Sequence, residues 1–321
     1  MSSMENRCQL GENAVTVVLA ALSSLESPNE EDTYDVDDEE LLDSLFRCLF
    51  LLLEHSENKV IFAEAGGVQL MIKIMQHEEL GHSYYGSAIV ALDMAVKDCQ
   101  PAFKNFVTDA SGLDTAFPAS MDVILQSILH EKEVIEEHQI SLIASLADGV
   151  AKMIKDMLLT KFAENDFKRI TWLMELFVRY SDKVEAMTKH LKDKQQLHPS
   201  ELYEEKLQCG FSTLQSIAVI LAYLWSFGNR AINARIEKEL SQHQLEKKHL
   251  RDTLSTYRDN IGNAGESVES AKTAVIEKYI CPLRLRENPV QGMELDEQGN
   301  PDQGWELDVK SKRQRTSDKL D

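Results

Sequence analysis

Two histidines and two glutamates stand together at residues 77–82, and metalloproteases use these residue types to hold and activate zinc. His77 and His82 are five residues apart, whereas two zinc ligands on one helical face need an i, i+4 spacing. His82 would point about 100° further round a helix than the zinc motif requires. We interpret residues 77–82 as a solvated loop, and we expect no metal and no cofactor.

No other arrangement in the sequence has the spacing of a catalytic centre. Residues 81–86, GHSYYG, lack the G-x-S-x-G spacing of a nucleophile elbow. Residues 262–265, GNAG, lack both a preceding strand and the dinucleotide-binding pattern, so we expect a turn there. We predict that the protein is not an enzyme. An enzyme with an unrecognised site remains an alternative, and it would need a deep pocket with converging titratable groups.

The acidic balance predicts protein partners rather than nucleic acid. The formal net charge of −20 repels phosphate backbones and attracts Lys/Arg-rich peptide segments. The candidates for attracting such a segment are Asp35, Asp37, Asp38, Glu39 and Glu40, at the end of an acidic run. Each exposed ion pair contributes about 0.2–1 kcal/mol, so several must act together and binding should weaken with salt. The alternative is that these acids only keep the protein in solution.

A short basic cluster lies near the C-terminus, within the segment KSKRQR. Its members are Lys310, Lys312, Arg313 and Arg315. Residues 281–321 hold three of the seven prolines and few apolar residues, which predicts a disordered tail. A basic run in such a tail can serve as a nuclear-localisation signal, so we expect the protein in the nucleus.

Helical periodicity dominates the rest of the chain, which has only 7 prolines and 14 glycines. Three apolar stripes recur at three- and four-residue steps: Leu42, Leu45, Phe46, Leu49, Leu52 and Leu53; Ile140, Ile143, Leu146, Val150, Ile154 and Leu158; and Leu207, Phe211, Leu214, Ile217, Ala218, Leu221 and Leu224. Leu41, Phe50 and Leu51 widen the first stripe, so we expect that helix to be buried between neighbours. We also expect Trp172, Met174, Leu176, Phe177, Phe211 and Trp225 in the core or at helix interfaces. The fold class is therefore all-α.

An internal repeat is visible at residues 60–75 and 106–121, where an apolar stretch meets glycine and a new apolar helix begins. Phe62 and Phe106 are 44 residues apart, and Gly67 and Gly112 are 45 apart. This period lies in the armadillo/HEAT range, in which stacked helical units bury one continuous core. We predict an armadillo/HEAT-like α-α superhelix with a modified C-terminal helical region.

The predicted boundaries are a partial N-terminal repeat at 1–26, an acidic loop at 27–40, armadillo-like repeats at 41–193, a C-terminal helical region at 194–280 and the tail at 281–321. We expect a linker at His198–Ser200, with Ser200 as the N-cap of the next helix. The five scattered cysteines include no CxxC pair, and no segment has the form of a signal peptide or a membrane span. We therefore expect a soluble protein in a reducing, intracellular setting, with no membrane partner.

Several longer strings carry a resemblance to a known family. They are residues 41–71, ALDMAV (91–96), FKNFV (103–107), GLDTAFPASM (112–121), 158–180 with its FAEND segment, YEEK (203–206), 210–224 and YRDNIGNAG (257–265). On these strings the chain resembles the C-terminal portion of the β-catenin-like, spliceosome-associated armadillo proteins, over roughly residues 10–280. The FAEND segment and the helix after it are the most specific part of the match.

The resemblance implies a nuclear, non-enzymatic scaffold of the pre-mRNA splicing machinery that binds basic, nuclear-localisation-type segments of partner proteins. Family members associate with a spliceosome-activating complex that contains a Myb-domain cell-division-cycle protein, so splicing factors are the expected partners. A homodimer through the C-terminal region is also implied. Family members carry earlier repeats and a basic signal before the matching part, so we expect a shorter groove here, with the nuclear signal in the tail. The alternative is a general armadillo-type adaptor outside splicing.

Overall fold

The computed structural model describes residues 13–24, 36–109, 112–117, 129–148, 152–194, 198–261 and 266–284, and every regular element among them is helical. The elements are the helix Asn13–Ser24, α2 (Val36–Leu53), α3 (Ser56–Glu64), α4 (Gly67–Gln76), α5 (Glu78–Val96), α6 (Gln100–Thr108), α7 (Gly112–Ala116), α9 (Leu129–Asp148), α10 (Lys152–Lys194), α11 (Pro199–Lys206), the π-helical turn η1 (Leu207–Phe211), α12 (Ser212–Ser226), α13 (Arg230–Gln242), α14 (Lys247–Asp259) and α15 (Glu266–Arg284). Residues 1–283 form one compact unit, and the description below concerns that unit.

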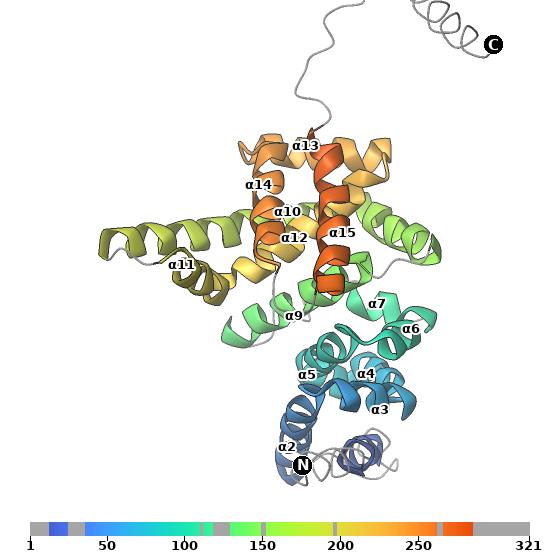
Figure 1. Ribbon diagram of the computed structural model, residues 1–321. Helices are drawn as coiled ribbons and strands as arrows, with labels where there is room; N and C mark the ends of the chain where they lie inside the picture. The colour runs from blue at the N-terminus through green and yellow to red at the C-terminus, as the bar shows by residue number, and fades with distance from the viewer. Residues whose placement is uncertain are drawn as a thin grey trace, which may run out of the picture. The chain divides into compact units, whose positions relative to one another are not determined.

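The first half of the unit repeats one helical arrangement. Helices α3, α4 and α5 pack on one another, and α6 packs on α7, which packs on α9 (Figure 1). Equivalent helices then stack between the two sets: α3 on α6, α4 on α7 and α5 on α9. This stacking confirms the expected all-α, armadillo/HEAT-like fold class.

Glycine positions explain the 45-residue repeat in physical terms. Gly67 and Gly112 open α4 and α7, next to phenylalanines that are completely buried in α3 and α6. A Cβ atom at Gly67 would lie 2.5 Å from the ring of Phe62, and one at Gly112 would lie 2.4 Å from the carbonyl oxygen of Phe106. Each turn is therefore too tight for any side chain, which is why glycine recurs with the repeat.

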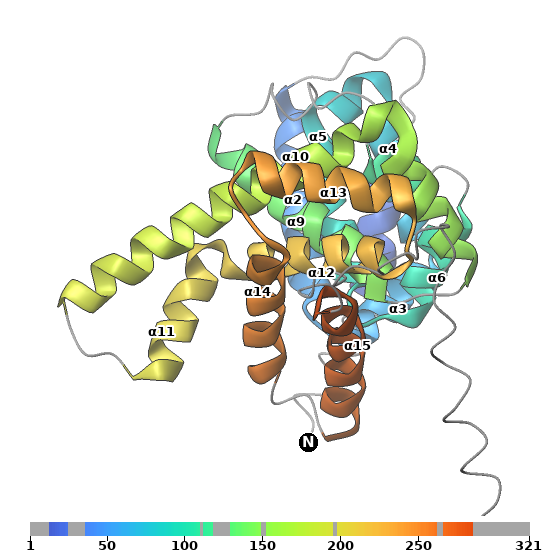
Figure 2. The same cartoon turned by 90° about the horizontal axis from the view of Figure 1, so that it is seen from above.

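The second half is organised around α12. This helix packs on α9, α10, α13 and α14 (Figure 2), and its residues from Thr213 to Trp225 are buried except for Ser216. Residues 200–226 are long and apolar enough to cross a membrane by length and composition alone, but 72% of the most apolar window is buried inside the protein. A helix that is apolar all round and buried in this way is a core helix.

Three expectations about the helices need correction. Helix α2 already begins at Val36, inside the expected loop at 27–40, and α15 continues to Arg284, past the expected start of the tail at 281. Residues 78–82 are the first turns of α5 rather than a loop. Acidic residues in the first turn of a helix suit the positive end of its dipole, which favours helix in the sequences that open α2 and α5.

Burial on α2 was only partly predicted. Leu42, Phe46 and Leu49 are buried as expected, whereas Leu41 and Leu51 are 47% and 65% exposed. The helix is thus covered on one broad face and not all round. The C-terminal stripe is also interrupted, because Gly210 adopts φ +89° within η1, where a Cβ would lie 2.6 Å from Tyr180.

The second predicted stripe is divided between α9, which ends at Asp148, and α10, which begins at Lys152, and Val150 and the side chain of Ile154 lie outside the described residues. The core predictions for later residues hold. Met174, Leu176, Phe177, Phe211 and Trp225 are buried, and Trp172 packs against the same core. The N-cap of α11 is His198 rather than Ser200, because the imidazole of His198 accepts from the backbone N–H of Ser200 at 3.4 Å. Pro199 takes the first helical position, where its missing N–H costs nothing.

Candidate functional site

The acidic residues predicted to attract a basic segment lie at the start of α2. Glu39 and Glu40 are exposed on its first turns, together with Asp43, and we call these three residues the α2 acidic cluster. Asp37 and Asp38 belong to the helix, although only their backbone is described, and Asp35 lies outside the described residues. Among the described residues, no ion pair involves any member of the α2 acidic cluster.

Tyr84 of α5 fixes the α2 acidic cluster against the stack. Its hydroxyl donates a hydrogen bond to the backbone oxygen of Glu39 at 3.2 Å, and its ring stacks on Phe46 with 5.7 Å between centroids. Burial, followed by the negative charges of Asp43 and Glu39, raises the pKa of Tyr84 to about 12. The carboxylates of Asp43 and Glu39 add to a local negative potential, which is the property that a cation-binding surface needs.

A second acidic row, on α9, has a different role. Glu136 pairs with Arg179, Glu133 pairs with Lys183, and Glu137 accepts a hydrogen bond from the hydroxyl of Tyr180 at 3.3 Å. These contacts join α9 to α10, and we call them the α9–α10 seam. Because the carboxylates of the seam are already paired, they attract an external cation less than the α2 acidic cluster does.

The same 45-residue step links α5 to α9. The imidazole Nδ1 of His138 lies 2.8 Å from a carboxylate oxygen of Asp93, and the two residues are 45 positions apart. Asp93 is buried, so this pair belongs to the contact between stacked helices rather than to an open surface.

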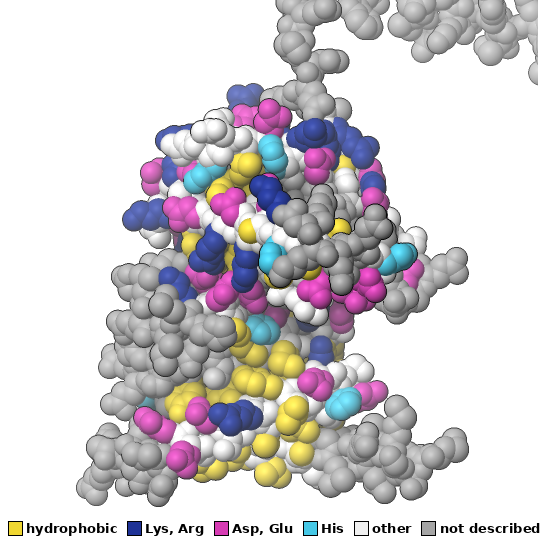
Figure 3. Space-filling model, turned by 90° about the vertical axis from the view of Figure 1, so that its left-hand side faces the viewer, with side chains coloured by type: hydrophobic (Ala, Val, Ile, Leu, Met, Phe, Trp, Pro, Cys, Tyr) yellow, Lys and Arg dark blue, Asp and Glu magenta, His cyan; other side chains and the backbone are white. Residues whose placement is uncertain are grey.

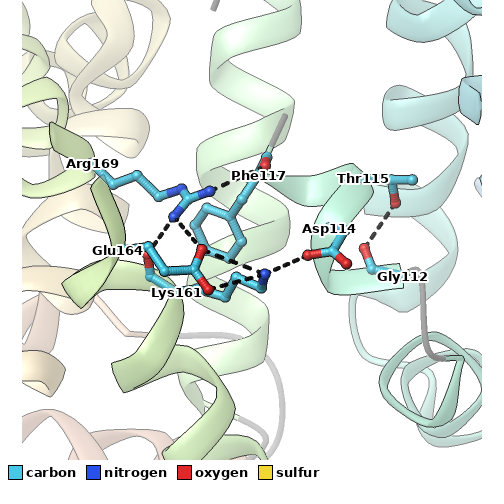
Figure 4. Close-up of polar contacts among 7 residues, drawn as sticks. All are labelled: Gly112, Asp114, Thr115, Phe117, Lys161, Glu164 and Arg169. Atoms are coloured by element: carbon cyan, nitrogen blue, oxygen red, sulfur yellow. Dashed lines mark hydrogen bonds and ion pairs between the residues drawn. The ribbon is translucent and has the colours of Figure 1, made fainter. Parts of the chain in front are cut away.

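The FAEND segment forms a sharp kink inside α10. Asn165, Asp166 and Phe167 have φ values of 51°, 55° and 59°, in the left-handed region that L-residues rarely adopt. The guanidinium of Arg169 closes this kink by donating hydrogen bonds to the backbone oxygen of Lys161 and to Glu164 (Figure 4).

Residues around the kink also reach α7 and the residue after it. Figure 4 shows Lys161 paired with Asp114 of α7, and Arg169 donating to the backbone oxygen of Phe117 at 3.5 Å. The Phe117 ring meets Phe162 edge-on at 5.2 Å and carries the Arg169 guanidinium 5.3 Å from its centroid. The most specific segment of the resemblance is therefore a structural joint between the repeat units and α10.

Surface chemistry differs along the unit. In the view of Figure 3, hydrophobic side chains gather on the lower part of the face, and Figure 1 places α2 to α6 at that level. Side chains of both charge signs cover the upper part, where Figure 1 places α10 to α14. Among the described residues, the exposed large hydrophobic side chains are Val17, Leu41, Leu51 and Val134.

Sequence reasoning missed a cavity of about 810 Å³ between the repeats and the C-terminal helices. Its lining includes serines spaced i, i+4 on α9 and on α12. This spacing places each pair of serines on one helical face, and it was a sequence pattern from which the cavity could have been predicted. The described residues contain no group of three His, Cys, Asp or Glu side chains placed to hold a metal ion. The side chain of His82, residues 262–265 and the basic cluster of Lys310, Lys312, Arg313 and Arg315 lie outside the described residues.

Comparisons with known proteins agree with this architecture. The sequence model of a family described as "Catenin-beta-like, Arm-motif containing nuclear" matches residues 1–255. Beta-catenin-like protein 1 of Bos taurus is 30% identical over 284 residues, which are 83% of this chain and 48% of that protein. The Homo sapiens protein of the same name is 30% identical over 282 residues, 83% and 48% of the two chains.

A more distant relative shows the same pattern. The Beta-catenin-like protein 1 homolog of Schizosaccharomyces pombe is 28% identical over 268 residues, which are 79% of this chain and 43% of that protein. The chain thus spans about half the length of the curated relatives that it matches.

Proposed function

The chain belongs to the catenin-beta-like family of Arm-motif containing nuclear proteins, and from this premise we propose that it is a non-enzymatic nuclear scaffold that binds Lys/Arg-rich segments of partner proteins. The observation that carries the proposal is the α2 acidic cluster, Glu39, Glu40 and Asp43, which is exposed and unpaired among the described residues. Other acids are paired within the fold, as in the α9–α10 seam. A surface that keeps several carboxylates unpaired at one end of an Arm stack suits a basic peptide.

We further propose that the partners are pre-mRNA splicing factors. This step rests on the resemblance of the strings around the FAEND segment to the spliceosome-associated members of the family. An armadillo-type adaptor outside splicing is the alternative. Affinity capture of the full chain from nuclear extract separates the two, because a splicing scaffold should retain splicing proteins with basic segments at low salt and lose them as salt rises.

The binding test uses a fluorescein-labelled peptide of ten residues, five of them Lys or Arg, titrated with the full chain. The triple variant Glu39→Gln, Glu40→Gln, Asp43→Asn should weaken binding on the order of tenfold, since each exposed pair contributes a few tenths of a kcal/mol or more. The matched control is Glu175→Gln, Asp182→Asn, Glu204→Gln, which removes three exposed acids from α10 and α11. Equal weakening by both triples would refute a specific role for the α2 acidic cluster.

Self-association is proposed on the same basis. The resemblance implies a homodimer through the C-terminal helical region. Sedimentation equilibrium of the full chain over a hundredfold concentration range measures this directly. A mass that stays at the monomer value of 36.4 kDa throughout would refute the dimer.

A further inference from the structure

A row of apolar side chains runs along the outer side of α2. Leu41, Leu45, Cys48 and Leu52 follow one another at i, i+4, i+7 and i+11, and Leu51 lies at the edge of this row. At about 100° per residue, the five residues fall within about 120° of the helix circumference. We call them the α2 apolar stripe. Its members are exposed or half-buried, whereas the adjoining face of the same helix is buried in the core.

The place of α2 in the stack shows what kind of element would cover this stripe. Helices α2, α5 and α9 form a row, because α5 packs on both α2 and α9. Helix α5 therefore has a helix on each of two sides, and none of its residues from Tyr84 to Val96 is exposed. In this fold, the element that buries a helix of the row is another helix of the row.

The stripe lies on the side of α2 that points away from α5. Phe46 of α2 stacks on Tyr84 of α5, which fixes the side that faces the row. Leu41, Cys48 and Leu51 lie about 140–160° round the helix from Phe46. All three are exposed, so this side of α2 is left open among the described residues.

The open side of α2 has the composition of a protein-binding surface. In Figure 3, hydrophobic side chains gather at the level where Figure 1 places α2, and charged side chains lie at the margins of this area. Exposed apolar patches that are rimmed by polar groups mark interaction sites. The α2 apolar stripe is therefore a candidate docking surface for a helix.

Charge on α2 selects the occupant. The sequence of this helix holds five acids and one base, and the α2 acidic cluster of Glu39, Glu40 and Asp43 stands at the same end as Leu41. An element that lies on the stripe therefore meets negative charge beside its first apolar contact. Lys or Arg side chains complement this charge, and acidic side chains are repelled by it.

We propose that the α2 apolar stripe binds an amphipathic helix of a partner protein, with the apolar face of that helix on the leucines and its Lys or Arg residues against the α2 acidic cluster. The inference rests on the proposed function, because it takes the basic segment from there, and it adds that the segment is helical. The stripe extends over about 17 Å from Leu41 to Leu52, so a partner helix of about three turns covers it. Helices that dock in this way use anchors at i, i+3 or i+4, and i+7.

The probe is a fluorescein-labelled peptide of about four helical turns, with Leu at the i, i+4, i+7, i+11 spacing and Lys at the remaining exposed positions. An isomer of the same composition distributes the leucines round the whole helix. Because both peptides carry the same charge, the α2 acidic cluster attracts them equally. By fluorescence anisotropy, the wild-type full chain should bind the striped peptide at least threefold more tightly than the isomer.

The decisive variant is Leu41→Gln in the full chain. Leu and Gln have similar helix propensities, so α2 should keep its structure. The variant should raise the Kd of the striped peptide about threefold to tenfold, because it removes the burial of about half a leucine side chain, and it should leave the Kd of the isomer unchanged. Val134→Gln is the matched control, because Val134 of α9 is 44% exposed and Leu41 is 47% exposed. The control should change neither Kd.

The outcomes separate this inference from the proposed function. Equal Kd values of the two peptides, or equal effects of Leu41→Gln and Val134→Gln, with the ten-residue basic peptide still bound, would overturn the inference and leave the proposed function standing. Absence of binding by every basic peptide would overturn both.

Two other occupants would also be recognised. Equally tight binding of a striped peptide with Glu in place of Lys would show that the stripe does not select a basic helix. Self-association of the free chain that Leu41→Gln abolishes in sedimentation equilibrium would show that a second copy covers the stripe. Either result would overturn the inference.

Discussion

At the scale of single residues, a side chain added at Gly67 or at Gly86 would clash with a neighbour, but the two neighbours differ. A Cβ at Gly67 would lie 2.5 Å from the ring of Phe62, and one at Gly86 would lie 2.6 Å from Cδ1 of Ile135. The Phe62 ring is fully buried and rigid, whereas the end of an isoleucine side chain can move. We predict that Gly67→Ala destabilises the protein by about 1–3 kcal/mol.

Gly86→Ala is the control for that prediction. The gain in helix propensity from Gly to Ala, up to about 1 kcal/mol, should offset most of its smaller steric cost. Urea denaturation followed by circular dichroism measures both variants. Equal destabilisation by the two alanines would show that the Phe62 contact does not set the turn.

Arg179 tests the α9–α10 seam. Glu136, its partner, is only 3% exposed, so removing the cation leaves a buried carboxylate without a partner. Because Arg179 itself is about half exposed, we predict a loss of about 1–3 kcal/mol for Arg179→Met rather than the larger cost of a fully buried pair. Adding Glu136→Gln should recover part of the loss. A double variant as unstable as the sum of the single variants would contradict this coupling.

The buried residues of α2 show what the sequence allows at this scale. The three- and four-residue spacing was enough to place Leu42, Phe46 and Leu49 in the core. The spacing was not enough to show that Leu41 and Leu51 are exposed. When a helix has apolar residues on every side, its sequence does not show which sides other helices cover. That information comes from tertiary packing, which here covers one face of α2.

At the scale of elements, the kink in α10 predicts that glycine and valine rank in opposite order of stability at a kinked and at an ordinary position of this helix. Asp166 is exposed and has φ +55°, a conformation that glycine adopts freely and β-branched residues resist. We predict that Asp166→Gly leaves stability unchanged within about 0.5 kcal/mol and that Asp166→Val lowers it by about 1–2 kcal/mol.

The control sits in the same helix with ordinary geometry. Asp182 is also exposed, and no left-handed residue lies near it in α10. There Gly should cost about 0.3–0.5 kcal/mol relative to Asp, and Val should be nearly neutral, because Asp and Val have similar helix propensities. Thermal melts of the four variants test this order. The same ranking of Gly and Val at both positions would show that the kink is not present in solution.

The elements were predictable where glycine marked a repeated turn and unpredictable where tertiary contacts bend a helix. Gly67 and Gly112 predicted two turns and the 45-residue spacing between them. Asn165 and Asp166 tolerate left-handed geometry and gave a weak signal, but Phe167 gave none. The contacts of Arg169 with Lys161 and Glu164 that hold this kink become visible only in the folded chain.

At the scale of the whole molecule, a charge of −20 does not distinguish acids that hold the fold from acids that face a partner. The sequence pointed to residues 35–40, and the structure shows Glu39 and Glu40 exposed without a described ion-pair partner. Nothing in the residue pattern separates these acids from Glu133 and Glu136, which pair with α10. Whether an acid is paired depends on which helix packs against it, and the packing of helices is set by the folded stack rather than by the local sequence.

Nuclear import is a property of the full chain, and it can be tested through the basic cluster near the C-terminus. We predict that the full chain fused to a large fluorescent reporter accumulates in the nucleus, and that replacing Lys310, Lys312, Arg313 and Arg315 with Ala reduces the nuclear-to-cytoplasmic ratio severalfold. The fourfold Ala variant of Lys73, Lys104, Lys168 and Lys278 removes the same charge from exposed positions on the helices and should not change the ratio. If both variants stay nuclear, import does not depend on the basic cluster, and a partner bound to the folded helices must carry the chain in. In that case the Glu39→Gln, Glu40→Gln, Asp43→Asn triple should be the variant that turns cytoplasmic, because it weakens the contact with such a partner.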